Sequence, residues 1–142
     1  MTSASQSPAI SQSAASAVPT SKKMLWAGRV ISAVPVLLMV FSAVLELVKA
    51  APAVQGFPRY GYPESLIVRI GVLELRSCIV YLIPSTAVLG AILMTGYLGG
   101  ATATNVRIGD PSYVMTVLLG VFVWGGLFFR DARLRALIPF RR

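Results

Sequence analysis

The sequence has 142 residues, of which 56% are hydrophobic and only 13% are charged. Its mean hydropathy is +0.74, and a soluble chain this short cannot hide so much apolar surface in one core. The composition therefore predicts an integral membrane protein. There is no histidine and one cysteine, which excludes histidine-ligated haem, the usual zinc sites, a disulfide framework and any Ser-His or Cys-His catalytic pair.

The net charge is +8, from 13 basic and 5 acidic residues. A basic balance is common in nucleic-acid binders, but here the basic residues flank long apolar stretches and form no stripe along a polar helix. They cluster in two places, at Lys22, Lys23 and Arg29 and at Arg130, Arg133, Arg135, Arg141 and Arg142. We therefore predict the lipid bilayer as the partner of these residues, and no nucleic-acid binding.

Residues 1–21 contain no charged and no aromatic side chain and are rich in Ser and Ala. Such a segment buries too little apolar surface to offset its ordering entropy, which predicts a disordered tail. A cleaved signal peptide beginning at Lys22 and ending near Ala53 is the alternative. Against it, the apolar stretch from Val30 to Leu45 is longer than in a normal signal peptide and follows a long polar tail.

Four apolar segments are long enough to cross a bilayer, which takes about 20 residues. They are residues 26–50, 63–83, 85–105 and 111–129. Pro35 lies inside the first, where a membrane helix tolerates it. Pro84 divides one long apolar run into two helices, with Ser85 and Thr86 as candidate N-caps. The predicted fold is all-α, an integral membrane four-helix bundle with a disordered N-terminal tail.

The connecting segments complete this division of the chain. Prolines, glycines and tyrosines in residues 51–65 predict a loop at the membrane interface. Asp110 and Pro111 form an N-cap and first-position pair that begins the last span. Residues 131–142 are a basic cytoplasmic tail whose Leu134, Leu137 and Ile138 are expected to face lipid. Residues 22–130 are the four-helix domain.

Four ionisable residues fall within the predicted spans: Glu46, Arg69, Glu74 and Arg76. A charge at bilayer depth costs a few kcal/mol even on the mildest scale, so each needs a partner or water and is a functional candidate. Paired structural ions, or side chains that reach the interface, are the alternative. Glu74 lies on the opposite side of its helix from Arg76, so it needs a neighbour from another helix or stays protonated.

An ion pair between Glu46 and Arg69 follows from their depth in the bilayer. Glu46 is near the end of the first predicted helix and Arg69 is near the start of the second, and these helices run antiparallel. At about 1.5 Å per residue, both side chains lie at a similar depth below the outer face. Matching depth is what an interhelical pair requires. Separate contacts of each side chain with the outer headgroups are the competing interpretation.

Gly96 and Gly100 form a small-residue face on the third span, where another backbone could approach closely. We predict that this face packs within the bundle, with a dimer interface as the alternative. The glycines form no nucleotide-binding motif because no strand precedes them. Cys78 has no second thiol as a redox partner and is interpreted as a small packing residue.

Three stretches of the chain resemble the DoxX-like family of small bacterial membrane proteins. They are GYPESLIVRIGVLEL, YLIPSTAVLGAILMTGYLGGATATNVRIGDP and VFVWGGLFFRDARLRALIPFRR, and the resemblance covers about residues 24–142, with the run 96–100 as its most specific part. It implies a four-helix membrane protein, in a family named for a subunit associated with a quinol oxidase and thiosulfate oxidation. Most members have no established activity.

Compared with the pattern of these relatives, Glu74 matches a glutamate of the second helix. Glu46 stands in place of a lysine and Asn105 in place of a histidine, and Arg69 and Arg76 have no counterpart. Loss of that histidine removes the expected ligand for a proton or metal role at Asn105.

Two functions follow as hypotheses. The first is an accessory or structural membrane subunit with neither intrinsic catalysis nor a cofactor, attached to a respiratory or other membrane complex or to a second copy of itself. The second is a small transporter or proton conduit that uses Glu74. The positive-inside rule predicts that both termini are cytoplasmic in the bacterial inner membrane, because the outer loops hold only Lys49, Arg59 and Arg107.

Overall fold

The computed structural model describes residues 21–137. The predicted tail, apart from Ser21, lies outside the described residues, as do Ile138, Arg141 and Arg142. The elements in chain order are α1 (Lys22–Leu47), α2 (Ala51–Arg59), the 3-10 turn η1 (Glu64–Leu66), α3 (Ile67–Leu82), α4 (Ala87–Arg107), α5 (Tyr113–Arg130) and α6 (Ala132–Leu137). Residues 21–137 contain no strand, so the predicted all-α class is confirmed for them.

Three of these helices are long and apolar enough to cross a membrane: α1, α4 and α5. Helix α3 has 16 residues and is continued at its start by the 3 residues of η1. The predicted count of four helices is met only in part, because the described chain has six, of which α2 and α6 are short.

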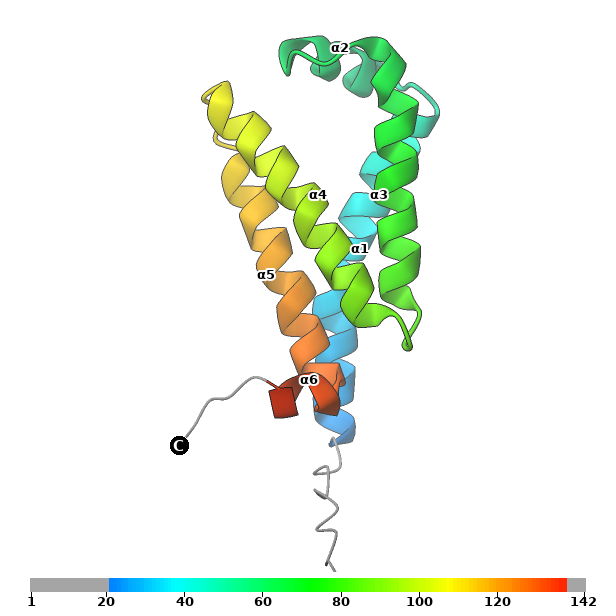
Figure 1. Cartoon of the computed structure of the whole chain (residues 1–142), viewed down its shortest axis with the longest axis vertical. Helices are drawn as coiled ribbons and strands as arrows, with labels where there is room; N and C mark the ends of the chain where they lie inside the picture. The colour runs from blue at the N-terminus through cyan, green and yellow to red at the C-terminus, as the bar shows by residue number, and fades with distance from the viewer. Residues whose placement is uncertain (1–20, 138–142) are drawn as a thin grey trace, which may run out of the picture.

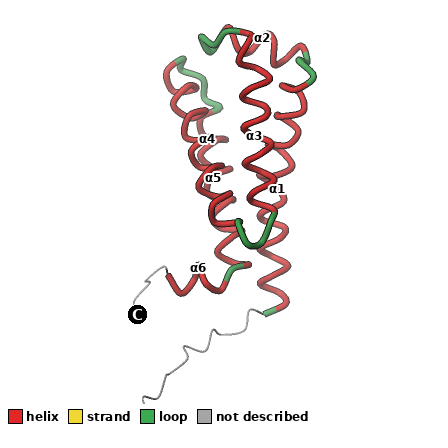
Figure 2. Tube along the Cα trace, turned by 45° about the vertical axis from the view of Figure 1, so that its right-hand side comes forward, coloured by secondary structure: helices red, strands yellow, loops and turns green. Residues whose placement is uncertain are grey.

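The four longer helices pack side by side. Helix α1 packs against α3 and α5, and α4 packs against the same two helices, so each has two neighbours in a closed ring. Helix α2 crosses one end of the ring and α6 lies against α5 at the other end (Figures 1 and 2). The short connection between α3 and α4 makes these two helices antiparallel, as expected from Pro84.

The predicted boundaries of the long segments agree with the structure to within a few residues. Helix α3 ends at Leu82, and the Thr86 hydroxyl donates a hydrogen bond of 2.8 Å to the Val80 carbonyl. Thr86 therefore caps the end of α3 and makes no side-chain cap on α4. Helix α5 begins two residues after Pro111, and Ser112, not Asp110, is its N-cap residue.

The prediction of a loop over residues 51–65 is wrong for its first part, which forms α2. Proline is compatible with the start of a helix, and Pro52 lies in the first turn of α2, where a missing N–H costs nothing. The turn that follows contains Gly61 at a φ of 79°, a conformation that favours glycine.

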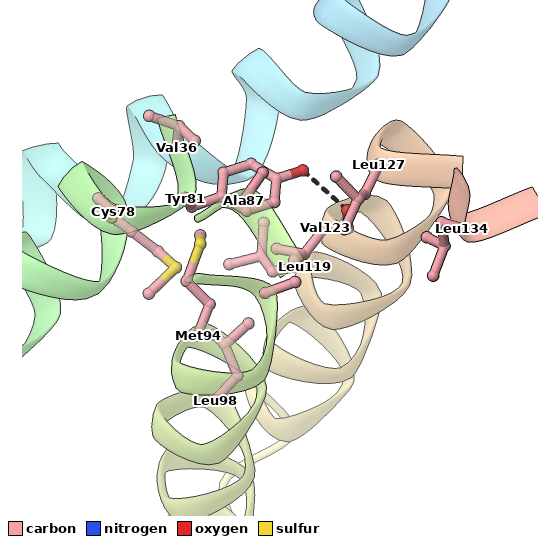
Figure 3. Packing of buried hydrophobic residues seen from close by; sticks show 12 residues of the cluster. Val36, Cys78, Tyr81, Ala87, Met94, Leu98, Leu119, Val123, Leu127 and Leu134 are labelled. Carbon is pink, nitrogen blue, oxygen red and sulfur yellow. Dashed lines mark hydrogen bonds between the residues drawn. The ribbon is translucent and has the colours of Figure 1, made fainter. Parts of the chain in front are cut away.

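The core lies where α1, α3, α4 and α5 meet, and Tyr81 is at its centre (Figure 3). The Tyr81 hydroxyl donates a 2.8 Å hydrogen bond to the Val123 carbonyl on α5 and lies 2.9 Å from the Ser32 hydroxyl on α1. The Arg130 guanidinium lies 4.4 Å from the centroid of the Tyr81 ring. A fully buried tyrosine thus has partners for its hydroxyl on two other helices, as such a group requires.

Close approach of backbones occurs at glycines other than the predicted pair. A Cβ at Gly28 would lie 2.9 Å from the Gly126 carbonyl oxygen, and one at Gly126 would lie 2.8 Å from the Ser32 nitrogen. At Gly96 and Gly100 it would meet no atom within 4 Å. The predicted close packing of Gly96 and Gly100 within the bundle is therefore not found in the described chain, because both glycines line an open space between α3 and α4.

The tail after α5 also differs from expectation. Leu134 was expected to face lipid, but it is buried as part of the core cluster. Arg135 donates hydrogen bonds to the carbonyls of Phe128 and Phe129 at the end of α5. These contacts fold α6 back against α5, and the apolar side chain of Leu134 is covered as a result.

Candidate functional site

Two carboxyl groups lie inside the ring of helices. Glu46, in the last turn of α1, is 8% exposed, and Glu74, on α3, is 2% exposed. Glu74 shares its helix face with the buried residues Ile67, Gly71, Cys78 and Tyr81. This face packs against α1, so the two carboxyl groups approach each other from neighbouring helices closely enough to interact.

Gly71 makes the burial of Glu46 possible. A Cβ at Gly71 would lie 2.9 Å from the Glu46 Cβ, 3.2 Å from its Oε2 and 3.1 Å from the Ala43 carbonyl oxygen. Since real Cβ atoms rarely come within 3.0 Å of another heavy atom, only glycine leaves room for the Glu46 side chain between α1 and α3.

The polar neighbours of the pair are hydroxyl groups. Ser42 on α1 and Tyr97 on α4 lie within hydrogen-bonding reach of the Glu74 carboxyl. One oxygen of each carboxyl group, Oε2 of Glu46 and Oε2 of Glu74, is buried without a hydrogen-bond partner. A buried polar atom left in this state is costly, and such atoms are rare in proteins unless a ligand or water satisfies them.

No basic side chain neutralises the pair within residues 21–137. The basic residues near this end of the bundle have other partners: Lys49 lies 3.6 Å from the Glu64 carboxylate and Arg59 lies 3.1 Å from the Asp110 carboxylate. Arg107 donates a hydrogen bond to the Tyr60 carbonyl. Two carboxylates buried together without a counter-charge repel each other and lose solvation, so ionising both is costly.

The predicted ion pair between Glu46 and Arg69 is not formed in the described chain. Arg69 is exposed, as is Arg76. The predicted match in depth between Glu46 and Arg69 was right, because Gly71, only two residues from Arg69, touches Glu46. The direction was wrong, because two residues of a helix differ by about 200° around its axis. Arg69 therefore points away from α1, and Glu46 faces Glu74.

A cavity of about 400 Å³ opens beside Glu46. It lies between α3 and α4, which diverge toward the end of the bundle where α2 lies (Figures 1 and 2). Glu46 and Asn105 supply polar groups at its wall, and the glycines Gly96 and Gly100 form an open part of it. Four aromatic side chains also line it: Phe57, Tyr60, Tyr62 and Tyr97.

Helix α2 and the turn after it are attached to the ends of α4 and α5. The Tyr62 hydroxyl lies 3.0 Å from the Thr104 hydroxyl, and the Phe57 and Tyr62 rings are 6.3 Å apart. Hydrogen bonds from the side chain and backbone of Ser112, together with the Arg59 guanidinium, hold the pKa of Asp110 below its usual range. These contacts place the aromatic residues over the cavity.

The five sequence-predicted candidates therefore divide into two groups. Glu46, Glu74 and Asn105 are buried and lie at or beside the cavity, whereas Arg69 and Arg76 are exposed. Sequence reasoning missed Ser42, Tyr97 and the aromatic residues of α2 and the turn after it. In the described residues, no group of three or more His, Cys, Asp or Glu side chains could hold a metal ion.

A sequence comparison decides the family of the chain: the DoxX-like family matches residues 30–126. The chain belongs to the DoxX-like family. The match runs from within α1 through most of α5, so it includes every residue that lines the cavity of this DoxX-like protein. No curated protein and no solved structure matches the sequence.

A second, open groove lies on the other side of α4, between α4 and α5. Its volume is about 810 Å³, and its lining is mostly apolar, including Leu98, Val117 and Phe128. Gly99 and Gly120 also line it, and a Cβ at either would meet no atom within 4 Å. In this DoxX-like membrane protein the groove faces outward from the ring of helices.

Proposed function

We propose that this DoxX-like protein binds and releases a cation at the Glu46–Glu74 pair, inside a bundle that spans the bacterial inner membrane four times. The single observation that carries the proposal is the burial of both carboxyl groups without a basic partner. The site therefore needs a proton or a charged ligand, and the cavity beside Glu46 offers a route for it. This deepens the hypothesis of a transporter or proton conduit that uses Glu74.

Four membrane crossings are supported by the length of α3, the second of the four longer helices. With η1, α3 runs from Glu64 to Leu82, which is about 28 Å at about 1.5 Å per residue. This matches a hydrocarbon core of about 30 Å. The clusters Lys22–Lys23 and Arg130–Arg133 lie at the same end of the bundle, which favours cytoplasmic termini. A reporter enzyme that is active only in the periplasm should be inactive when it is fused after Arg142; an active fusion would contradict this topology.

Infrared spectroscopy of the full chain in lipid nanodiscs tests the cation site. A protonated carboxyl group has its own C=O stretching band, which shifts when its proton exchanges for deuterium. We expect such a band, its shift within minutes in deuterated buffer, and its loss or displacement in Glu46→Gln and Glu74→Gln. Glu64→Gln is the matched control, because Glu64 is exposed beside Lys49. A band that never exchanges would overturn the proposal, since a sealed carboxyl pair cannot release a cation.

An accessory subunit is the second candidate function, and the groove between α4 and α5 favours it. The open positions Gly99 and Gly120 leave space for a helix of another membrane protein, such as a respiratory complex, or of a second copy. Gly99→Leu and Gly120→Leu should then abolish co-purification of the partner in mild detergent while the chain stays folded. Unchanged co-purification would exclude this groove as the contact surface.

A further inference from the structure

We infer that the cavity beside Glu46 binds a small organic amine in its ammonium form, with its N–H groups on the Glu46 carboxylate and its apolar body among the aromatic side chains. This inference rests on the proposed cation site and names the class of its ligand. The observation that points to a ligand is Glu46 itself, which lines the cavity, is more than nine-tenths buried and has an oxygen with no partner.

The polar groups of the cavity fit a ligand that donates hydrogen bonds. The unpartnered Oε2 of Glu46 can only accept a hydrogen bond when the carboxyl group is ionised. An ammonium group supplies both N–H donors and the missing positive charge. Asn105, on α4, adds an amide oxygen to the same wall. Glu74 has Ser42 and Tyr97 as its neighbours and does not line the cavity, so one ammonium pairs with one carboxylate, that of Glu46.

The apolar groups of the cavity fit an organic body better than a bare ion. Phe57, Tyr60, Tyr62 and Tyr97 surround the space, and aromatic faces attract organic cations. A calcium ion needs about 6–8 oxygen ligands, and the side chains of Glu46 and Asn105 supply fewer than this number. The volume of about 400 Å³ falls within the range of small-molecule sites, about 300–1,000 Å³.

The position of α2 indicates where the amine enters. Phe57, Tyr60 and Tyr62 belong to α2 and the turn after it, at the end of the bundle opposite α6. The contacts that attach this segment to α4, such as the one between the Tyr62 and Thr104 hydroxyls, lie at the protein surface or partly below it. Entry from this end requires only that these contacts open.

Three probes of similar size separate the contributions of charge and N–H donors. Benzylamine in its ammonium form carries both a positive charge and N–H donors. Benzyltrimethylammonium carries the charge without N–H donors, and benzyl alcohol carries neither. Titration calorimetry is done on the full chain in nanodiscs, with empty nanodiscs to measure partition into lipid. We expect benzylamine to bind about tenfold or more tightly than either of the other probes, because a charge-assisted hydrogen bond in a buried site contributes this much.

Two pairs of variants locate the binding. Glu46→Gln should weaken benzylamine about tenfold or more, and Glu64→Gln, which removes the same charge outside the cavity, should not change it. Gly100→Leu should also block benzylamine, because Gly100 lines the cavity and its Cβ would meet no atom within 4 Å. Gly99→Leu places the same side chain in the other groove and should leave binding intact.

The outcomes separate this inference from the proposed function. Equal binding of benzylamine and benzyl alcohol, or benzylamine binding that survives Gly100→Leu, would overturn the inference. If the carboxyl band still exchanges and depends on Glu46 and Glu74, the site is a proton site and the proposed function stands. If Glu46→Gln fails to fold, the Gly100→Leu and Gly99→Leu pair decides, because a Cβ at either position would meet no atom within 4 Å.

Discussion

Gly71 on α3 is the residue against which the Glu46 side chain packs, with only 2.9 Å between the Glu46 Cβ and the place where a Cβ of residue 71 would stand. Gly71→Ala should therefore force α1 and α3 apart and lower the stability by about 1–3 kcal/mol, as overpacking does. Thermal unfolding in detergent measures this loss. Gly99→Ala is the matched control: it meets no atom and should be neutral or slightly stabilising through helix propensity. Equal effects of the two substitutions would refute the packing.

Two adjacent glycines of α5, Gly125 and Gly126, should differ in how much stability they lose on substitution by alanine. A Cβ at Gly126 would lie 2.8 Å from the Ser32 nitrogen and 3.0 Å from the Gly28 carbonyl oxygen, whereas one at Gly125 would meet only Ile31, at 3.9 Å. Gly126→Ala should lower the unfolding temperature clearly, and Gly125→Ala should not, since close backbone approach replaces the hydrophobic driving force in lipid. If Gly125→Ala is the more damaging, α1 and α5 pack at another angle.

The Tyr81 hydroxyl joins α3 to α1 and α5, so Tyr81→Phe should destabilise the protein although it changes neither shape nor apolar area much. Its loss leaves the Ser32 hydroxyl without this partner and removes the bond to the Val123 carbonyl. We expect a loss of about 1–2 kcal/mol in thermal or denaturant unfolding. Tyr113→Phe, at an exposed tyrosine, serves as the control. A Tyr81→Phe protein as stable as the wild type would show that the network contributes no net stability.

Asp110 should make the connection between α4 and α5 sensitive to acid. Its pKa is held below the usual range by Ser112 and Arg59, so its contribution to stability is present above the ordinary pKa of about 3.9 and is lost as the pH falls through the native value. The unfolding temperatures of wild type and Asp110→Asn should differ at neutral pH and converge in acid below about pH 3.9. A difference that is the same at every pH would mean that Asp110 acts without its charge.

The amino-acid sequence by itself determined the helical class, the four long apolar segments and their ends to within a few residues. It did so because the length of an apolar run and the helix breakers are local properties. The placement of Glu74 and Arg76 on opposite sides of α3 also followed from helical periodicity, and Glu74 is buried while Arg76 is exposed. The glycine at position 109, with a φ of 68°, ends α4 by an equally local rule.

Tertiary structure alone decided which side chains meet. The depth of a residue along its helix follows from its number, at about 1.5 Å per residue, but the rotation of each helix about its axis is set by its neighbours. For this reason Glu46 and Arg69 were matched in depth and yet point in different directions, and Glu46 faces Glu74. For the same reason Gly28, Gly71 and Gly126 lie at close contacts while Gly96 and Gly100 line an open cavity.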